Sequence, residues 1–326
     1  MRVFKLSLLA AAVAGVATVS VAQADTTVYG SVRISETWTD IDGGDDFWDV
    51  RNETSRLGFR GSEDLGNGLA AIYHYEFGVD ASDTADVGGE DVGGRLAYVG
   101  LNGGFGQLTL GRQWEPYYFA VAGEVDVFNG INSGNGYFSN RLAALRSGNM
   151  LVYTTPSFNG LTASAAVTND GAAGDDGGDV WQVAASYDNG SLFLGAGWRQ
   201  VGEDAVIDPD SDFFLDDPLL ADDLDQFGVQ GRYLLGAFGL AGSWQRTDDG
   251  DDEVDNYDVV GSFRFGSNTL QLAYFDTDDT VDGWIVGAEH ALSKRSRLWI
   301  EYGDNDFEDE AEPDVANLSI GMRHDF

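Results

Sequence analysis

The chain has no cysteine, so it can form no disulfide, no thiolate nucleophile and no cysteine-based zinc site. It has only three histidines, His74, His290 and His324, which leaves little material for histidine-centred catalysis. Basic residues are also scarce, 18 against 55 acidic ones, and the formal net charge of -37 argues against a nucleic-acid partner because phosphates would be repelled. We therefore expect no nucleic-acid binding, no cofactor and no specific metal site.

Long hydrophobic runs are missing beyond the N-terminus, where no stretch approaches the ~18–20 apolar residues that a transmembrane helix needs. The N-terminus itself has the layout of a secretory signal: two basic residues, the apolar run LSLLAAAVAGVATVSV and the small-x-small site AQA. We expect cleavage after Ala24, which makes 1–24 a signal peptide and 25–326 the mature domain. The protein is then exported from the cytoplasm.

The mature sequence is rich in segments that alternate apolar and polar residues, the pattern of a strand with one apolar face. Gly, Asn, Asp or Pro bound these segments, and no long helical pattern interrupts them. We predict sixteen strands, at 27–39, 50–62, 69–80, 94–102, 105–114, 149–156, 160–168, 179–188, 191–201, 225–235, 238–247, 255–266, 268–277, 282–292, 296–304 and 315–326.

The connections between these segments alternate in length. Short turns such as EDLGNG, SFNG and SKR separate long acidic loops such as NDGAAGDDGGD and DNDFEDEAEP. A soluble sandwich has no reason to sort its connections into two classes, whereas an outer-membrane barrel has short periplasmic turns and long extracellular loops. The pattern predicts an all-β fold, a 16-stranded antiparallel transmembrane β-barrel.

The two faces of the segments differ as the walls of such a barrel would. In VYGSVRIS, Val28, Val32 and Ile34 share one face, and Arg33 lies on the other. Ionised side chains cannot face hydrocarbon cheaply, so the charged face is expected to line a wet interior. The final segment, LSIGMRHDF, alternates in the same way and stops on Phe326 in the middle of a strand.

Several segments resemble the Gram-negative general porins of the outer membrane. SRLGFRGSEDLGNGLAAIYHYEFGVD (55–80) resembles their second and third strands, and RLAYVGLNGGFGQLTLGRQWEPYY (95–118) resembles the fourth and fifth strands and the start of the inward-folded third loop. VYTTPSFNGLTASAAV (152–167) and VGAEHALSKRSRLWIEYG (286–303) are similar to later hairpins. The terminal GMRHDF resembles the last strand of the family.

This resemblance implies a water-filled channel for the passive diffusion of small hydrophilic solutes and ions, and no enzymatic activity. It also implies a homotrimer embedded among outer-membrane lipid and lipopolysaccharide. The final aromatic, Phe326, corresponds to the residue that the barrel assembly machinery recognises in the family. The third loop, at about 115–148, corresponds to the segment that narrows the channel.

The resemblance places the pore constriction between this loop and the facing wall. The expected acidic residues are Glu124 and Asp126 of the loop. The expected basic residues are Arg33, Arg56, Arg60, Arg112, Arg141 and Arg146. Opposed rows of charge would set up a transverse field that admits polar solutes. Arg112 shares parity with two leucines and needs a bulge or a strand end to reach the lumen; alternatively, the arginines pair with wall carboxylates and stiffen the barrel.

The acidic loops allow two interpretations: a vestibule that attracts cations, or hydration in a saline habitat such as that of a halophile. We expect hydration for most of the loop charge and a weak cation preference as its by-product. The alternative transport function is a solute-selective channel for phosphate, sugars or organic acids. A surface adhesin is a further alternative, whereas an outer-membrane enzyme is disfavoured because no GxSxG motif is present and no histidine lies in a predicted outer loop.

Overall fold

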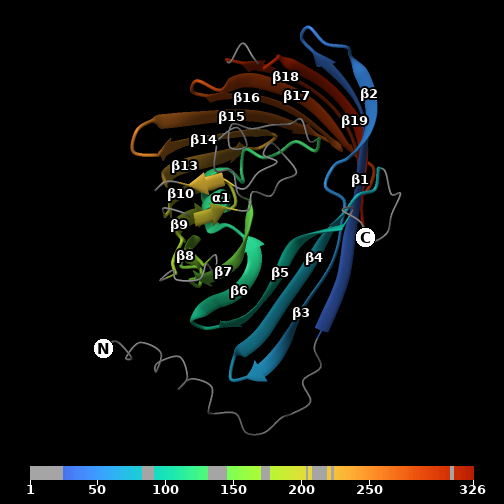
Figure 1. The fold of residues 1–326 in the computed structure, drawn as a ribbon. Helices are drawn as coiled ribbons and strands as arrows, with labels where there is room; N and C mark the ends of the chain where they lie inside the picture. The colour runs from blue at the N-terminus through green and yellow to red at the C-terminus, as the bar shows by residue number, and fades with distance from the viewer. Residues whose placement is uncertain are drawn as a thin grey trace.

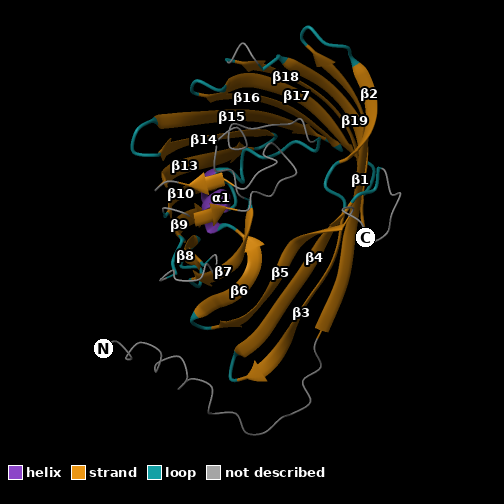
Figure 2. Cartoon of the chain, viewed as in Figure 1, coloured by secondary structure: helices purple, strands orange, loops and turns teal. Residues whose placement is uncertain are grey.

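The computed structural model of the chain describes residues 25–82, 92–130, 145–169, 177–202, 205–207, 219–221, 224–308 and 312–326 (Figure 1). The predicted signal peptide, 1–24, and the predicted constriction residue Arg141 lie outside these ranges. Strands make up most of the described chain, and the short helix α1 (Pro116–Val121) lies among them (Figure 2). No helix within the described ranges is long and apolar enough to cross a membrane.

The strands run antiparallel to their neighbours. They are β1 (Asp25–Ile41), β2 (Phe47–Asn52), β3 (Arg56–Gly66), β4 (Leu69–Val79), β5 (Val92–Gly103), β6 (Gly106–Trp114), β7 (Arg146–Thr154), β8 (Leu161–Thr168), β9 (Val180–Asp188), β10 (Leu192–Val201), β11 (Ala205–Ile207), β12 (Leu219–Ala221), β13 (Leu224–Leu235), β14 (Phe238–Asp248), β15 (Glu253–Phe265), β16 (Asn268–Thr277), β17 (Val281–Ala291), β18 (Ser296–Phe307) and β19 (Val315–Asp325).

The sheet closes on itself, because β1 pairs with β19 as well as with β2 and β3. β2 and β3 form one wall strand, because both pair with β1. The strand conformation is interrupted between them at 53–55, where Thr54 has φ of 61°. Within the described ranges, β11 and β12 pair only with each other. The wall therefore has sixteen antiparallel strands, which confirms the predicted fold; the break in the second strand and the β11–β12 hairpin were not predicted.

The wall is apolar outside, as its alternation predicts. On β16, Leu270, Leu272 and Tyr274 are 45%, 56% and 48% exposed, and the alternate residues Ala273 and Phe275 are buried. The same arrangement recurs around the barrel, so an apolar band faces outward. Such a band is suited to hydrocarbon, and the closed ladder leaves no sheet edge unpaired within it.

The third loop enters the barrel and packs against its inner wall. The helix α1 contacts β8, β9, β10, β13 and β14, and its buried residues join an apolar cluster with inward residues of β14–β17. Glycines make this contact possible: a side chain at Gly195 would collide with the carbonyl of Ala120, and one at Gly197 would meet Tyr117. The predicted inward course of the loop is therefore seen directly for residues 115–130 (Figure 2).

Phe326 completes the seam between the first and last strands. Its amide donates to Gly30 O at 3.0 Å, and the Gly30 amide donates to Phe326 O at 3.1 Å. The ring lies over Gly30, where any side chain would collide with it, and is 51% exposed on the outside. The aromatic terminus thus extends the ladder by one residue beyond β19.

Candidate pore constriction

The first anchor of the inward loop is a buried ion pair at its base. Arg199 of β10 places Nη1 2.5 Å from Glu115 Oε2, and both side chains are almost fully buried. Ser147 donates a further hydrogen bond to Glu115 Oε1 at 2.5 Å. Removing one partner of such a pair leaves an uncompensated buried charge, so the pair holds the start of the loop firmly against β10.

The second anchor lies after α1 and involves β13. Gln230 donates to the carbonyl of Phe119 at 2.6 Å and accepts from the amide of Glu124 at 2.9 Å. Arg232 donates to Glu124 Oε2 at 2.9 Å and lies 3.4 Å from Asp188 Oδ1. Burial raises the pKa of Glu124, and the neighbouring Arg232 opposes that rise. Glu124 therefore fastens the loop to the wall that carries it.

The third anchor is on β18, across the barrel interior from the first. Glu301 accepts from the backbone amides of Asn129 and Gly130 at 2.8 and 2.9 Å. Gln271 of β16 donates to the carbonyl of Val127 at 3.3 Å. The loop thus follows the inner wall from β10 to β18, and the rest of the passage is bounded by strands that include β17, β18, β19, β1, β3, β4, β5 and β7.

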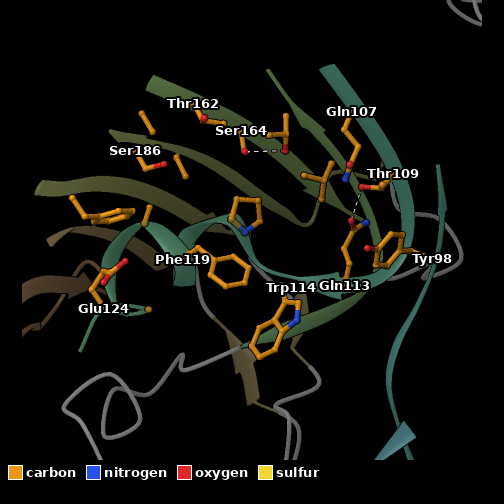
Figure 3. A pocket seen from close by; sticks show the side chains of 18 residues that line it. Tyr98, Gln107, Thr109, Gln113, Trp114, Phe119, Glu124, Thr162, Ser164 and Ser186 are labelled. Atoms are coloured by element: carbon orange, nitrogen blue, oxygen red, sulfur yellow. Dashed lines mark hydrogen bonds between the residues drawn. The ribbon is translucent and has the colours of Figure 1, made fainter. Parts of the chain in front are cut away.

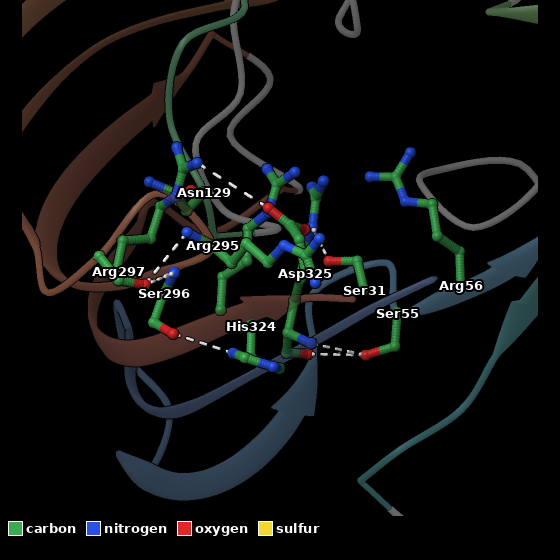
Figure 4. A network of polar contacts seen from close by, with 12 residues as sticks. Ser31, Ser55, Arg56, Asn129, Arg295, Ser296, Arg297, His324 and Asp325 are labelled. Atoms are coloured by element: carbon green, nitrogen blue, oxygen red, sulfur yellow. Dashed lines mark hydrogen bonds and ion pairs between the residues drawn. The ribbon is translucent and has the colours of Figure 1, made fainter. Parts of the chain in front are cut away.

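A row of arginines crosses three neighbouring strands of that wall. Arg297 of β18 lies opposite Arg323 of β19, which in turn lies opposite Arg33 of β1. Like charges directly opposite each other destabilise a sheet, so this row lowers the stability of the wall. Asp325 offsets part of it: its carboxylate is 2.7 Å from Arg323 and 3.9 Å from Arg297. Figure 4 shows Asp325 between Ser31 and Arg297.

Further arginines continue the row around the wall. Arg56 and Arg95 share Glu76, whose Oε1 lies 3.7 Å from Arg56 and 2.8 Å from Arg95. Arg146 is buried with its guanidinium 4.8 Å from the ring centroid of Trp114, within electrostatic range of Arg56. Arg56 is also within range of Arg323, which joins the two groups into one field.

We call this part of the lumen the throat and define it by six arginines and the three carboxylates that contact them. The arginines are Arg33, Arg56, Arg95, Arg146, Arg297 and Arg323. The carboxylates are Glu76, Glu289 and Asp325. Because guanidinium groups outnumber these carboxylates two to one, the described throat carries a positive field.

One loop carboxylate, Asp126, lies within electrostatic range of this field. Its Oδ2 accepts a hydrogen bond from Tyr118 at 2.6 Å, and it feels the charge of Arg33 across the passage. Burial raises the pKa of this carboxyl above its ordinary value, with the Tyr118 hydrogen bond acting in the opposite direction. Asp126 is therefore the loop carboxylate that interacts electrostatically with Arg33, whereas Glu124 forms an ion pair with Arg232.

The structure brings some of the predicted basic residues together and leaves others apart. Arg33, Arg56 and Arg146 lie in the throat. Arg60 shares the inward face of β3 but is four residues, about 13 Å, nearer the short turn, where its guanidinium lies 5.2 Å from the Tyr29 ring centroid.

Arg112 lies on the outward face. A bulge does occur beside it, between Gly111 and Gln113, but Arg112 pairs with Ala97 on the parity of the exposed Leu110, and its Nε donates to Gly94 O. The bulge changes the register toward β7 without turning Arg112 inward, so the prediction that placed it with the other arginines does not fit this geometry.

Sequence reasoning missed Arg95, Arg232, Arg297 and Arg323. The polar parity of the last strand contains Arg323, so the alternation alone could have identified it. Arg95 gave no such signal: it shares parity with outward residues and lies in the throat only because the β4–β5 register shifts between Glu76 and Phe77.

Comparison with known proteins agrees with this architecture. The family of Gram-negative porins matches residues 9–310 of the chain. Outer membrane porin protein 32 of Delftia acidovorans is 30% identical over 325 residues, 90% of this chain and 88% of that protein. A monosaccharide porin of a Halomonas species is 28% identical over 368 residues, 96% of this chain and 98% of that protein.

Among solved structures, an anion-selective porin from Comamonas acidovorans matches with a TM-score of 0.76 at 25% identity, over 93% of this chain and 100% of that one. These similar proteins are channels and not enzymes. A closed barrel with an apolar exterior, an inward loop and a charged passage is what that role requires. The chain therefore belongs to the family of Gram-negative porins and forms a multi-pass β-barrel channel of the outer membrane.

Proposed function

We propose that the channel passes small hydrophilic solutes and ions by passive diffusion and that its throat favours anions. The observation that carries this proposal is the excess of guanidinium groups among the described residues of the throat, six against the three carboxylates defined above. Fixed charge of one sign in a narrow passage raises the local concentration of the opposite ion. Inorganic phosphate and small organic acids are the candidate solutes of this class.

The weak cation preference expected from the composition relied on the acidic loops and on the acids of the third loop. That loop carries three acids, Glu115, Glu124 and Asp126. Arg199 contacts the first and Arg232 the second, which leaves Asp126 as the loop carboxylate that faces the throat. One carboxylate does not offset the arginine excess, so the throat supports anion preference instead.

The names of the similar proteins are consistent with two classes of solute. The solved structure named above is described as anion-selective, and its identity to this chain is 25%. The Halomonas relative is named for monosaccharides. Neutral sugars are therefore the second candidate class. Their binding requires a part of the lumen that contacts the solute through uncharged side chains.

The test is the reversal potential of purified protein in planar bilayers under a potassium chloride gradient. We expect step-like conductance and a potential of the sign that chloride preference gives. The Arg56→Gln channel should move that potential toward zero, whereas Arg60→Gln, on the same face of the same strand but outside the throat, should move it much less. A wild-type potential of the opposite sign would overturn the proposal, and insertion without conductance would favour the adhesin alternative.

We also propose the partners that the family resemblance implies: two further copies of the chain, outer-membrane lipid with lipopolysaccharide, and the barrel assembly machinery. The exposed ring of Phe326 at the end of the final strand supports its role as the assembly signal. Deleting Phe326 should lower the amount of folded barrel in the outer membrane, and crosslinking of intact cells should give a trimer. Normal assembly without Phe326 would contradict that role.

A further inference from the structure

A second feature of the lumen lies beside the throat. A cavity of about 570 Å³ lies between α1 and the inner faces of β6–β10 (Figure 3). We call this cavity the recess. The lining residues that matter here are Gln107, Trp114, Phe119, Thr162, Ser164 and Ser186. Its volume is within the range of small-molecule sites, which run from about 300 to 1,000 Å³.

The recess has little charge, although it opens beside a strongly charged passage. The described residues that line it include no arginine or lysine and one carboxylate, Glu124. Arg232 already pairs with that carboxylate at 2.9 Å. A charged solute would therefore gain little here compared with the throat, and the recess favours an uncharged one.

One side of the recess is aromatic. Phe119 is 52% exposed, although α1 is held inside the barrel. Trp114 lies beside it, with ring centroids 5.5 Å apart and planes tilted by 48°. Figure 3 shows both rings at the edge of the recess. An apolar face kept open to water within a polar lumen is a surface on which the C–H face of a ligand can rest.

The opposite side of the recess is a group of small polar side chains. The hydroxyls of Thr154 and Ser164 are 3.0 Å apart, so one proton serves their mutual bond and the other O–H remains a donor. The side chains of Gln107, Thr162 and Ser186 have no hydrogen-bond partner within the described part of the chain. These groups offer both donors and acceptors facing the aromatic side.

We infer that the recess is a binding subsite for a neutral, ring-shaped polyhydroxylated solute of monosaccharide size. Such a molecule has C–H faces that can lie on Phe119 and hydroxyls that can bond with the wall. The inference deepens the neutral-sugar candidate of the proposed function and does not depend on the anion preference of the throat. It predicts that a sugar molecule binds in the recess as it crosses the channel, so that the effect of sugar on the current saturates with sugar concentration.

The experiment titrates single-channel current in planar bilayers with D-glucose, and with glycerol at equal osmolality. Glucose should reduce the current along a saturating curve and add binding noise, whereas glycerol should produce a gradual, non-saturating decrease. The reversal potential of the same channels is recorded without sugar, so that failure of the anion proposal and failure of the recess proposal are seen separately. A glucose curve that follows the glycerol curve would overturn the inference.

Two variants locate the binding. Phe119→Ala removes the aromatic platform, and Thr162→Val removes one wall hydroxyl at nearly constant volume; each should raise the half-saturating glucose concentration by about two- to tenfold. Phe158→Ala, at an exposed turn outside the recess, is the matched control and should leave the curve unchanged. Thr162→Val does not touch α1, so its result holds even if Phe119→Ala disturbs the loop. Saturable glucose binding that neither variant weakens would place the site elsewhere and overturn the assignment.

Discussion

Asp126 combines burial, a hydrogen bond from Tyr118 and the charge of Arg33 in one side chain. Its carboxyl has a raised pKa, so it takes up a proton at a higher pH than an ordinary aspartate, whose pKa is about 4. Protonation removes negative charge that faces the throat. The positive field of the arginines is then less compensated, because guanidinium groups keep their charge throughout this range.

We predict that the anion preference increases as the pH falls from 7 toward 4. The Asp126→Asn channel should already have the increased preference at pH 7 and should vary less over the same range. The measurement is the reversal potential at each pH. Asp251→Asn, on an exposed loop, is the control for the loss of one carboxylate. Equal pH profiles for the wild-type and Asp126→Asn channels would rule out this carboxyl as the titrating group.

The throat residues show which side-chain placements can be predicted from the sequence and which cannot. Parity assigns Arg33 and Arg56 to the lumen, because alternation alone separates the two faces of a strand. It gives the wrong face for Arg95, which lies at a register shift, and no sequence pattern indicated that shift. It cannot find pairs such as Glu124–Arg232, since their partners are 108 residues apart and meet only when the barrel closes.

At the scale of elements, the third loop and its wall form one unit. Arg199 and Glu115 fix the base of the loop, and both are buried. Gly195 and Gly197 let α1 lie directly on β10. The width of the passage therefore depends on the wall as much as on the loop.

We predict that Arg199→Leu loosens the loop, because it leaves Glu115 buried without its cation, a change that costs about 3–5 kcal/mol. The single-channel current should become larger and noisier, and the melting temperature should fall. The double variant with Glu115→Gln is the control, since it removes both charges and should recover most of the lost stability. A quiet, wild-type current from Arg199→Leu would mean that the other two anchors hold the loop alone.

The elements themselves were predicted well where the chain alternates regularly. The predicted strand at 268–277 coincides with β16, and most other boundaries agree within a few residues. The predicted strand at 50–62 was less accurate, because Thr54 adopts a left-handed conformation that interrupts it. A threonine gives no advance sign of this conformation, which glycine or asparagine adopt more readily.

At the scale of the whole molecule, two fields of opposite sign act on an ion. The formal net charge of -37 comes largely from acidic loops, whereas the throat is positive. Exposed charges lose their reach as salt rises, with a Debye length of about 30 Å at 0.01 M and 10 Å at 0.1 M. Charges inside the narrow passage are screened less.

We predict that the anion preference strengthens between about 0.01 and 0.1 M salt, because the repulsion of anions by the loops fades first. The reversal potential under a constant concentration ratio, measured at several mean concentrations, tests this. Acidic-to-amide changes at Asp249, Asp251 and Asp252, in the turn between β14 and β15, should weaken the dependence on salt. An anion preference that weakens over this range would mean that the loops do not influence entry.

The closed barrel was the most predictable property of the whole chain. Sixteen alternating segments and two classes of connection identified it, because closure is the arrangement that leaves no strand edge in the membrane. The sign of the charge among the described throat residues was not predictable from composition, since the net charge counts every carboxylate equally, whereas the throat depends on the few charged groups that line the passage.

The arginine row has a consequence for how the barrel comes apart. Arg297, Arg323 and Arg33 cross the join where the first and last strands meet, and this join is held by hydrogen bonds without a short covalent connection. Like charges therefore repel one another across the seam at which the closed wall can separate between β1 and β19. Bound anions should weaken this repulsion, so we expect that transfer into a buffer of very low ionic strength separates the barrel at this seam first.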